Sequence, residues 1–181
     1  MRIYIIKKYG IIVYRRYILA SGDTITIFKP QDNEPPVADF AIRDSRNSHP
    51  VLDFALTEIG VFSHVMPRNY AGTTGLTVYL HYAMTSAEVN DIKLEGYFER
   101  IGDQQQDLDA DGFAAAQNSG DITVPGTSGL VDIIAITFTN GAQMDSIAVG
   151  EGFRFKVKRI AVAGTDATGD LELRFIEIKE T

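Results

Sequence analysis

The C-terminal stretch of the sequence decides the fold. It reads Gly152-Phe-Arg-Phe-Lys-Val-Lys-Arg-Ile160, then a loop, then Leu171-Glu-Leu-Arg-Phe-Ile-Glu-Ile-Lys-Glu180. Apolar and charged side chains alternate in both runs, which is typical of strands with one buried face. The loop is rich in Gly, Thr and Asp, the residue types that favour turns. The two runs are therefore predicted to form an antiparallel pair, and such a pair needs a larger sheet to be stable.

The remainder of the chain supplies further strands and no long amphipathic helix. The run 130–139 is the most hydrophobic, so we expect it to be a central strand covered on both faces. Gly96 interrupts an apolar face and indicates a bulge or a close neighbour. Short helical turns are expected at residues 113–117 and 143–147. Other strands are predicted at residues 24–28, 39–43, 51–56, 61–66, 76–84, 90–101 and 122–124.

This succession of strands predicts the fold class. Strands follow one another with turn clusters between them and no intervening helices, which favours an all-β protein with antiparallel sheets. Long connections at residues 102–120 and 140–150 look like crossings between two sheets rather than tight hairpins. We therefore predict an antiparallel β-sandwich of the jelly-roll kind, with roughly eight to ten strands.

Composition and charge limit the classes of function. The chain has 181 residues, 45% of them apolar, enough for one domain with a full core. It contains no cysteine, which excludes disulfides, zinc–thiolate sites and cysteine nucleophiles. The net charge is −7, yet the first 22 residues carry +5 without an acid, so the rest carries −12. An acidic body argues against nucleic-acid binding, which needs a basic face.

The basic N-terminal segment, Met1–Ala20, is dense in Ile and Tyr, which favour strands. Charges interrupt it too often for a transmembrane helix or a secretory signal, so neither is predicted, and a membrane is not among the favoured partners. Three interpretations stay open: extra strands of the domain, an extended arm that docks on a neighbouring subunit, or a basic tail facing a membrane or nucleic acid. Residues 1–22 are thus predicted to be an arm or extra strands, and residues 23–181 a single sandwich domain.

One motif suggests a metal. Asp107, Asp109 and Asp111 alternate and are followed by Gly112, as at the start of a calcium-binding loop. The twelfth position of such a loop should be Glu, but here it is Asn118, and no flanking helices are predicted. Calcium bound by these three carboxylates is one hypothesis. A solvated acidic loop is the alternative, and no other cofactor is indicated.

Other polar and aromatic residues give no catalytic pattern. His64 and His81 could meet across neighbouring strands, but with His49 far away they lack a third fixed metal ligand. No nucleophile motif, P-loop or recognisable carboxylate pair is present, so the chain is predicted not to be an enzyme. The tyrosines could stack on sugars or simply pack, as aromatic side chains on half-exposed strands do: Tyr70, Tyr79, Tyr82 and Tyr97.

Five strand-and-turn motifs carry a resemblance to known proteins: Val61–Tyr70, Leu76–Met84, Asp109–Gln117, Met144–Arg159 and Ala167–Leu173. With these motifs the chain resembles a group of small β proteins from tailed bacteriophages and viral metagenomes. The resemblance covers roughly residues 28–181 and leaves out the basic N-terminal segment. It implies a virion component with a jelly-roll fold, such as a head decoration protein or part of a fibre or tail, and it brings no catalytic residues.

Together these observations predict a structural virion protein. The most favoured function is a capsid decoration subunit, a homotrimer that acts through subunit contacts on a capsid or tail surface. Met1–Ala20 could pair as an extra strand with the major capsid protein or another virion protein. The alternative is a carbohydrate-binding module or a receptor-binding fibre or tail domain, and the absence of tryptophan counts against sugar stacking.

Overall fold

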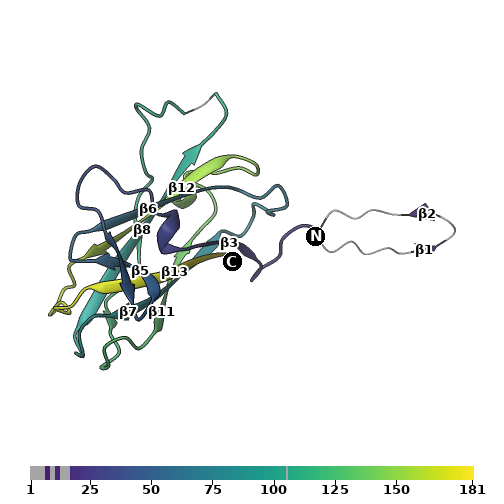
Figure 1. Ribbon diagram of the computed structural model, residues 1–181. Coiled ribbons are helices and arrows are strands. Elements are labelled where there is room, and N and C mark those ends of the chain that lie inside the picture. Colours follow the sequence, from purple (N-terminus) through teal and green to yellow (C-terminus); the bar gives the residue numbers. More distant parts are fainter. Residues whose placement is uncertain (1–6, 9–10, 13–16, 105) are drawn as a thin grey trace.

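The computed structural model describes residues 7–8, 11–12, 17–104 and 106–181. These residues form thirteen strands, which Figure 1 shows as two facing sheets with a small separate hairpin. All strand pairings within the sheets are antiparallel. The predicted all-β antiparallel sandwich is therefore confirmed. The described residues contain two three-residue 3-10 helices, η1 (Pro30–Asp32) and η2 (Ala142–Met144), and neither could span a bilayer.

The larger sheet has six strands, with β13 at its centre. Strand β7 lies on one side of β13, while β5 and β3 share the other side, one at each end. Strands β11 and β4 lie at the two ends of this order, and β3 is also an edge strand because it pairs with β13 alone. The members in spatial order are β11 (Asp132–Phe138), β7 (Leu76–Met84), β13 (Leu171–Glu180), β5 (His49–Phe54) and β4 (Ile42–Arg46), with β3 (Thr24–Phe28) beside β13.

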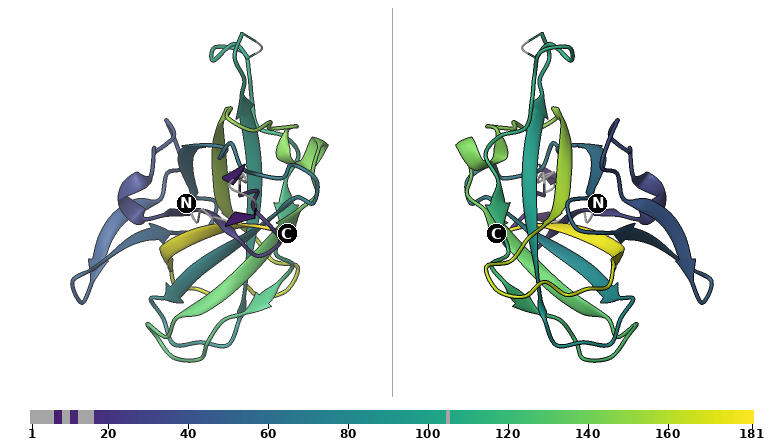
Figure 2. Two further views of the ribbon diagram at one scale, coloured as in Figure 1. Left: turned by 90° about the vertical axis from the view of Figure 1, so that its right-hand side faces the viewer. Right: turned by 90° about the vertical axis from the view of Figure 1, so that its left-hand side faces the viewer.

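The smaller sheet has five strands and packs against the larger one. Its order is β10 (Ile122–Thr123), β8 (Asp91–Ile101), β12 (Gly152–Ile160) and β6 (Ile59–Val65), with β9 (Gln117–Asn118) also paired to β8. The connection after β8 projects from one end of the sandwich in both views of Figure 2. Buried aliphatic and aromatic side chains from both sheets form one continuous core between them.

Gly96 on β8 has the close neighbour that the sequence indicated. A Cβ at this position would lie 2.9 Å from the Phe138 ring and 3.1 Å from the Phe155 ring. Phe138 belongs to the larger sheet and Phe155 to the smaller one, so the glycine lets aromatic rings of both layers meet. The centroids of Phe98 and Phe138 are 4.8 Å apart in an edge-to-face contact, a favoured arrangement for buried rings.

The predicted pairing of the two C-terminal runs is wrong. Strand β12 lies in the smaller sheet and β13 in the larger one, and the ten residues between them cross from sheet to sheet. Arg159, at the end of β12, is 2% exposed and faces inward. Its guanidinium donates hydrogen bonds to the carbonyls of Phe54, Ala167 and Gly169 at 3.0, 2.6 and 2.6 Å. This side chain fixes the crossing to the larger sheet. A tight hairpin between the two strands would use a much shorter loop than this connection.

Three further local predictions are corrected by the structure. Strand β11 is an edge strand rather than a central one, and its exposed side chains include Ile133 at 51%. Residues 113–117 form no helical turn: the chain is extended here, and the Ala114 amide donates to the Phe98 carbonyl at 2.8 Å. Strand β4 begins at Ile42 and pairs with β5 through a tight turn in which Asn47 and Ser48 have positive φ, as in a type I′ hairpin.

The N-terminal segment is described only in part. Strands β1 (Lys7–Lys8) and β2 (Ile11–Ile12) pair with each other, and Figure 1 places them away from the sandwich. The remaining residues of the segment up to Arg16 lie outside the described part. From Tyr17 the chain approaches the sandwich, where the Leu19 amide donates to the Asn69 carbonyl at 2.7 Å. The domain boundary at residues 22–23 stays a prediction.

Candidate functional site

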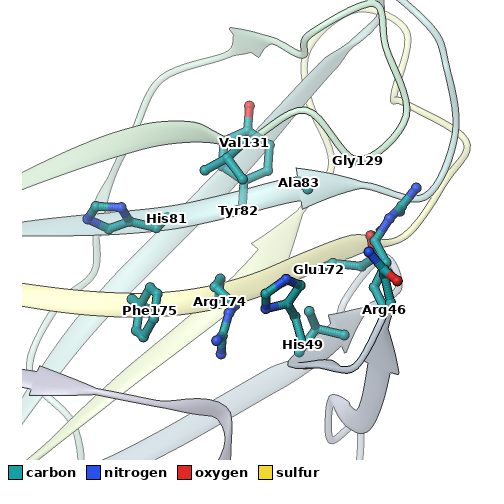
Figure 3. Close-up of a pocket in the computed structure, with 12 residues that line it drawn as sticks. Arg46, His49, His81, Tyr82, Ala83, Gly129, Val131, Glu172, Arg174 and Phe175 are labelled. Atoms are coloured by element: carbon teal, nitrogen blue, oxygen red, sulfur yellow. Dashed lines mark hydrogen bonds and ion pairs between the residues drawn. The ribbon is translucent and has the colours of Figure 1, made fainter.

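A groove of about 480 Å³ lies on the outer face of the larger sheet, and its lining is mainly apolar (Figure 3). It runs over β7, β13 and β5 and is bordered by the β4–β5 turn and by the connection that leads into β11. Its lining residues are Arg46, Asn47, His49, Val51, His81, Tyr82, Ala83, Gly129, Val131, Glu172, Arg174 and Phe175.

A β-bulge in β13 shapes the groove. Leu173 stands opposite Tyr82 and Phe175 stands opposite His81, so Arg174 is the extra residue between two consecutive pairs. Leu173 and Ile176 both point into the core, and the two residues between them, Arg174 and Phe175, both line the groove. In a regular strand these neighbours would point to opposite faces. The bulge thus turns a cation and an aromatic ring toward the same ligand-accessible face.

Phe175, Arg174 and His81 form a composite wall. The Arg174 guanidinium carbon lies 4.5 Å from the centroid of the Phe175 ring, within the range of a cation–π contact. The His81 ring meets Phe175 edge-on, with centroids 6.2 Å apart. Figure 3 shows Arg174 between Phe175 and His49 along the groove. A donor nitrogen of Arg174 is held by the Pro50 carbonyl at 2.9 Å, which fixes the guanidinium beside the ring.

At the other end of the groove, Arg46 is held by three groups of the protein. Its guanidinium pairs with Glu172 and donates to the Met84 carbonyl at 3.2 Å and to Ser128 Oγ at 2.8 Å. Gly129 lies directly against it: a Cβ there would be 2.8 Å from an Arg46 nitrogen. The cation therefore joins β4, β7, β13 and the 128–131 connection, and its charge is neutralised by Glu172.

Asp53 lies on the same face, paired in register with Glu172 on one side and Ile42 on the other. Its Oδ1 atom is buried without a hydrogen-bond partner among the described residues. Burial, and then the negative charge of Glu172, raise the pKa of Asp53 to about 6. The Glu172 end of the groove is therefore neutral to negative, while the Arg174 end is positive.

Asp53→Asn is expected to stabilise the protein at neutral pH. Because the folded pKa is raised from 3.8 to about 6, the folded state binds this proton more tightly, and stability falls as pH rises through that window. The neutral amide removes this penalty, so the free energy of unfolding should rise by about 1 kcal/mol near neutrality and change little near pH 4. Urea denaturation at both pH values measures it, with Asp103→Asn, an exposed carboxylate in the connection after β8, as the control. A gain that is the same at both pH values would contradict the assignment.

The outer face of the smaller sheet also carries aromatic rings, but they are occupied by the protein's own cations. Phe113, from the connection after β8, meets Tyr97 with centroids 6.4 Å apart. The Lys156 ammonium lies 3.8 Å from the Tyr97 centroid and 4.4 Å from that of Phe113. The Arg154 guanidinium covers Phe113 at 5.0 Å. These contacts leave the groove on the larger sheet as the better candidate for a ligand site.

The three aspartates of the sequence motif lie in the exposed connection after β8. The Asp109 amide donates to Asp107 Oδ1 at 3.0 Å, and the Asp111 amide donates to the Asp107 carbonyl at 2.8 Å. Within the described part of the chain, no group of three or more His, Cys, Asp or Glu side chains is arranged to hold a metal ion. Calcium binding by Asp107, Asp109 and Asp111 stays a prediction.

The sequence suggested that His64 and His81 could meet, but the structure brings together His49 and His81. His64 is on β6 in the smaller sheet and packs edge-on against Phe28 and Phe153, at 6.0 and 6.1 Å. It therefore cannot meet His81 on β7, because the two strands belong to different sheets. His49 and His81 instead line the same groove. No hydrogen bond joins either imidazole to another described residue.

Two of the four candidate tyrosines are core residues. Tyr70 and Tyr82 are 4% and 0% exposed, and the Tyr82 hydroxyl donates to Asp132 at 3.2 Å. Tyr79 and Tyr97 lie on outer faces, each near a lysine. Besides the buried Tyr82, the groove is lined by the partly exposed Phe175 ring, which the sequence pattern did not single out. The signal available was the consecutive apolar pair Phe175 and Ile176, where the strict alternation of apolar and charged residues fails.

These features define an antiparallel β-sandwich with a groove on one outer face. No known protein family matches the sequence, and no curated protein matches it. Among solved structures, the chain is similar to a family 35 carbohydrate-binding module from an environmental isolate, with a TM-score of 0.51 and 9% identity over 87% of this chain and 94% of that one. This likeness supports the fold.

Two further solved structures resemble the chain less closely. One is the CBM36-1 domain of a multidomain xylanase from the hindgut metagenome of Trinervitermes trinervoides, with a TM-score of 0.47, 8% identity, and coverage of 86% of this chain and 97% of that one. The other is a chain from infectious bursal disease virus, Gt strain, with a TM-score of 0.35, 8% identity, and coverage of 98% of this chain and 37% of that one.

Proposed function

We propose that this chain is a non-catalytic carbohydrate-binding β-sandwich, which holds a glycan in the groove over β7, β13 and β5. The observation that carries the proposal is the partly exposed Phe175 ring, turned by the bulge into a mainly apolar groove between Arg174 and His81. Sugars offer apolar ring faces edged by hydroxyl groups, so they suit a site that combines an aromatic ring with nearby hydrogen-bonding side chains.

Binding without turnover fits the polar groups of the groove. Glu172 is the one carboxylate among the described lining residues, and it is paired with Arg46. Glycoside hydrolysis generally uses two carboxyl groups on opposite sides of the scissile bond. The fold shared with a family 35 carbohydrate-binding module supports the proposal only at the level of the scaffold, since one fold hosts many functions.

Phe175→Ala is expected to weaken glycan binding at least about tenfold, because it removes the main apolar contact surface of the groove. The wild-type protein is first applied to an array of neutral and acidic glycans, and the affinity of the best binder is then measured by calorimetry. Phe40→Ala is the matched control, since Phe40 is 46% exposed and lies beside β6 of the smaller sheet. No binding to any glycan, or an equal loss in both variants, would overturn the proposal.

A second candidate function is a virion surface subunit that acts through contacts between copies. The specific observation in its favour is β11, an edge strand with exposed Ile133, preceded by exposed Leu130 and Val131. An uncovered edge of this kind can pair with a strand of another chain. This candidate includes a homotrimer on a capsid or tail surface and an attachment through Met1–Ala20.

Mass measurement by light scattering separates the two candidates. A trimer that binds virus particles, and that loses this binding when residues 1–20 are deleted, favours the virion subunit. A monomer that binds glycans with or without residues 1–20 favours the carbohydrate-binding module.

A further inference from the structure

We infer that the ligand of the groove is an acidic glycan, whose carboxylate is held at the Arg174 end while a sugar ring packs against Phe175. The inference rests on the proposed function and deepens it by naming the class of sugar. It is drawn from the charges and the unused hydrogen-bonding groups of the groove, taken one end at a time.

At the Glu172 end, the charged groups satisfy each other. Arg46 pairs with Glu172 and also donates hydrogen bonds to Ser128 and the Met84 carbonyl. Asp53 stands beside Glu172 in the register of the sheet, so a second carboxyl group lies at this end of the groove. An anionic ligand group is disfavoured here, so the acidic group of a ligand belongs at the opposite end.

At the Arg174 end, the unused groups are cationic or polar and none is a carboxylate. Arg174 uses one terminal nitrogen for the Pro50 carbonyl and makes no other hydrogen bond to a described residue. His49 and His81 line the groove and are without hydrogen-bond partners in the described part of the chain. A carboxylate in this position would gain charge-assisted hydrogen bonds from the guanidinium fork, which are stronger than those between neutral groups.

The same wall suits a ring that carries the charge. The guanidinium and the Phe175 ring are 4.5 Å apart, so one ligand unit can touch the aromatic surface and the cation together. A uronic acid has this combination, because its sugar ring has an apolar face and one ring carbon carries a carboxylate group. A neutral sugar would leave the Arg174 charge without a partner inside a partly enclosed groove.

The test compares an oligogalacturonate with its methyl ester, in which each carboxylate is replaced by a neutral methyl ester group, by calorimetry with the full chain. The wild-type protein is expected to bind the acid about tenfold more tightly than the ester, and to lose most of this preference as salt is raised to about 0.5 M. Arg174→Gln should bring the ratio close to one, while Arg174→Lys should retain part of it because the charge remains without the planar fork.

The possible results separate this inference from the proposed function. Equal binding of acid and ester, or an array on which neutral glycans alone bind, would overturn the acidic-glycan inference and leave carbohydrate binding intact. No binding to any neutral or acidic glycan would overturn both. Phe40→Ala should leave the ratio unchanged, and Arg174→Gln must retain the wild-type thermal midpoint for its loss of preference to support the inference.

Discussion

Arg159→Met is expected to lower the free energy of unfolding by about 3 kcal/mol or more, because three carbonyl groups lose their donor inside the protein. The guanidinium bonds Phe54 at the end of β5, and Ala167 and Gly169 in the crossing between the two sheets. Methionine fills similar space but donates nothing. Burial lowers the pKa of Arg159, and Asp170, Asp166 and Glu88 oppose that shift, so the cation is maintained by nearby acids.

The measurement is urea denaturation of Arg159→Met beside Lys158→Met. Lys158 precedes Arg159 on the same strand but points to the outer face, where it stands opposite Glu95 and Ile59. Its replacement should change the unfolding free energy by less than about 0.5 kcal/mol. Arg159→Lys should lose most of the same stability, since one ammonium group cannot reproduce the fork-shaped reach of the guanidinium. Similar losses at Lys158 and Arg159 would show that the buried hydrogen bonds are unimportant.

Gly75→Ala is the second change with a large expected effect. Gly75 precedes β7 with φ of +109°, and a Cβ there would lie 2.2 Å from the Phe138 carbonyl oxygen and 3.0 Å from the Asn140 amide nitrogen. Both neighbours are backbone atoms, so a side-chain rotation cannot relieve the overlap. We expect the free energy of unfolding to fall by about 3 kcal/mol or more, because alanine disfavours the left-handed backbone and its Cβ displaces the end of β11.

Gly141→Ala separates these two contributions. Gly141 has φ of +99°, close to that of Gly75, but a Cβ there would meet no atom within 4 Å. Alanine at this position should lower the free energy of unfolding only by the backbone contribution, about 1 kcal/mol. Thermal unfolding of both variants gives the comparison. Equal melting temperatures for the two alanine variants would mean that the close approach to Phe138 contributes nothing.

Much of the fold could be predicted from local patterns in the sequence. Period-two alternation identified β7, β8, β12 and β13 because each has one core face and one outer face. Gly96 was correctly predicted to have a close neighbour, since an apolar face rarely gives up a side chain without a packing reason. The pairing of the strands was harder to predict from the sequence. Strands β12 and β13 lie in different sheets, and Arg159 holds the connection between them across the sandwich. A long-range hydrogen bond of this kind has no local signature in the sequence.

Hydrophobicity also misplaced β11. Its run of Ile133, Ile134 and Ile136 indicated a central strand, yet β11 lies at an edge with alternate side chains exposed. A strand that keeps apolar side chains on an uncovered face has the same composition as a buried one, so sequence alone does not separate the two cases. The groove could not be predicted either, because its lining residues come from four separate segments of the chain.

The bulge at Arg174 has a consequence for how this surface could change over evolutionary time. Before it, odd-numbered residues of β13 enter the core (Leu171 and Leu173), and after it even-numbered ones do (Ile176 and Ile178). The strand therefore changes parity at a single inserted position, which the interior does not use. A lineage could delete or exchange that position and alter what the surface recognises, while every interior contact of the strand kept its partner.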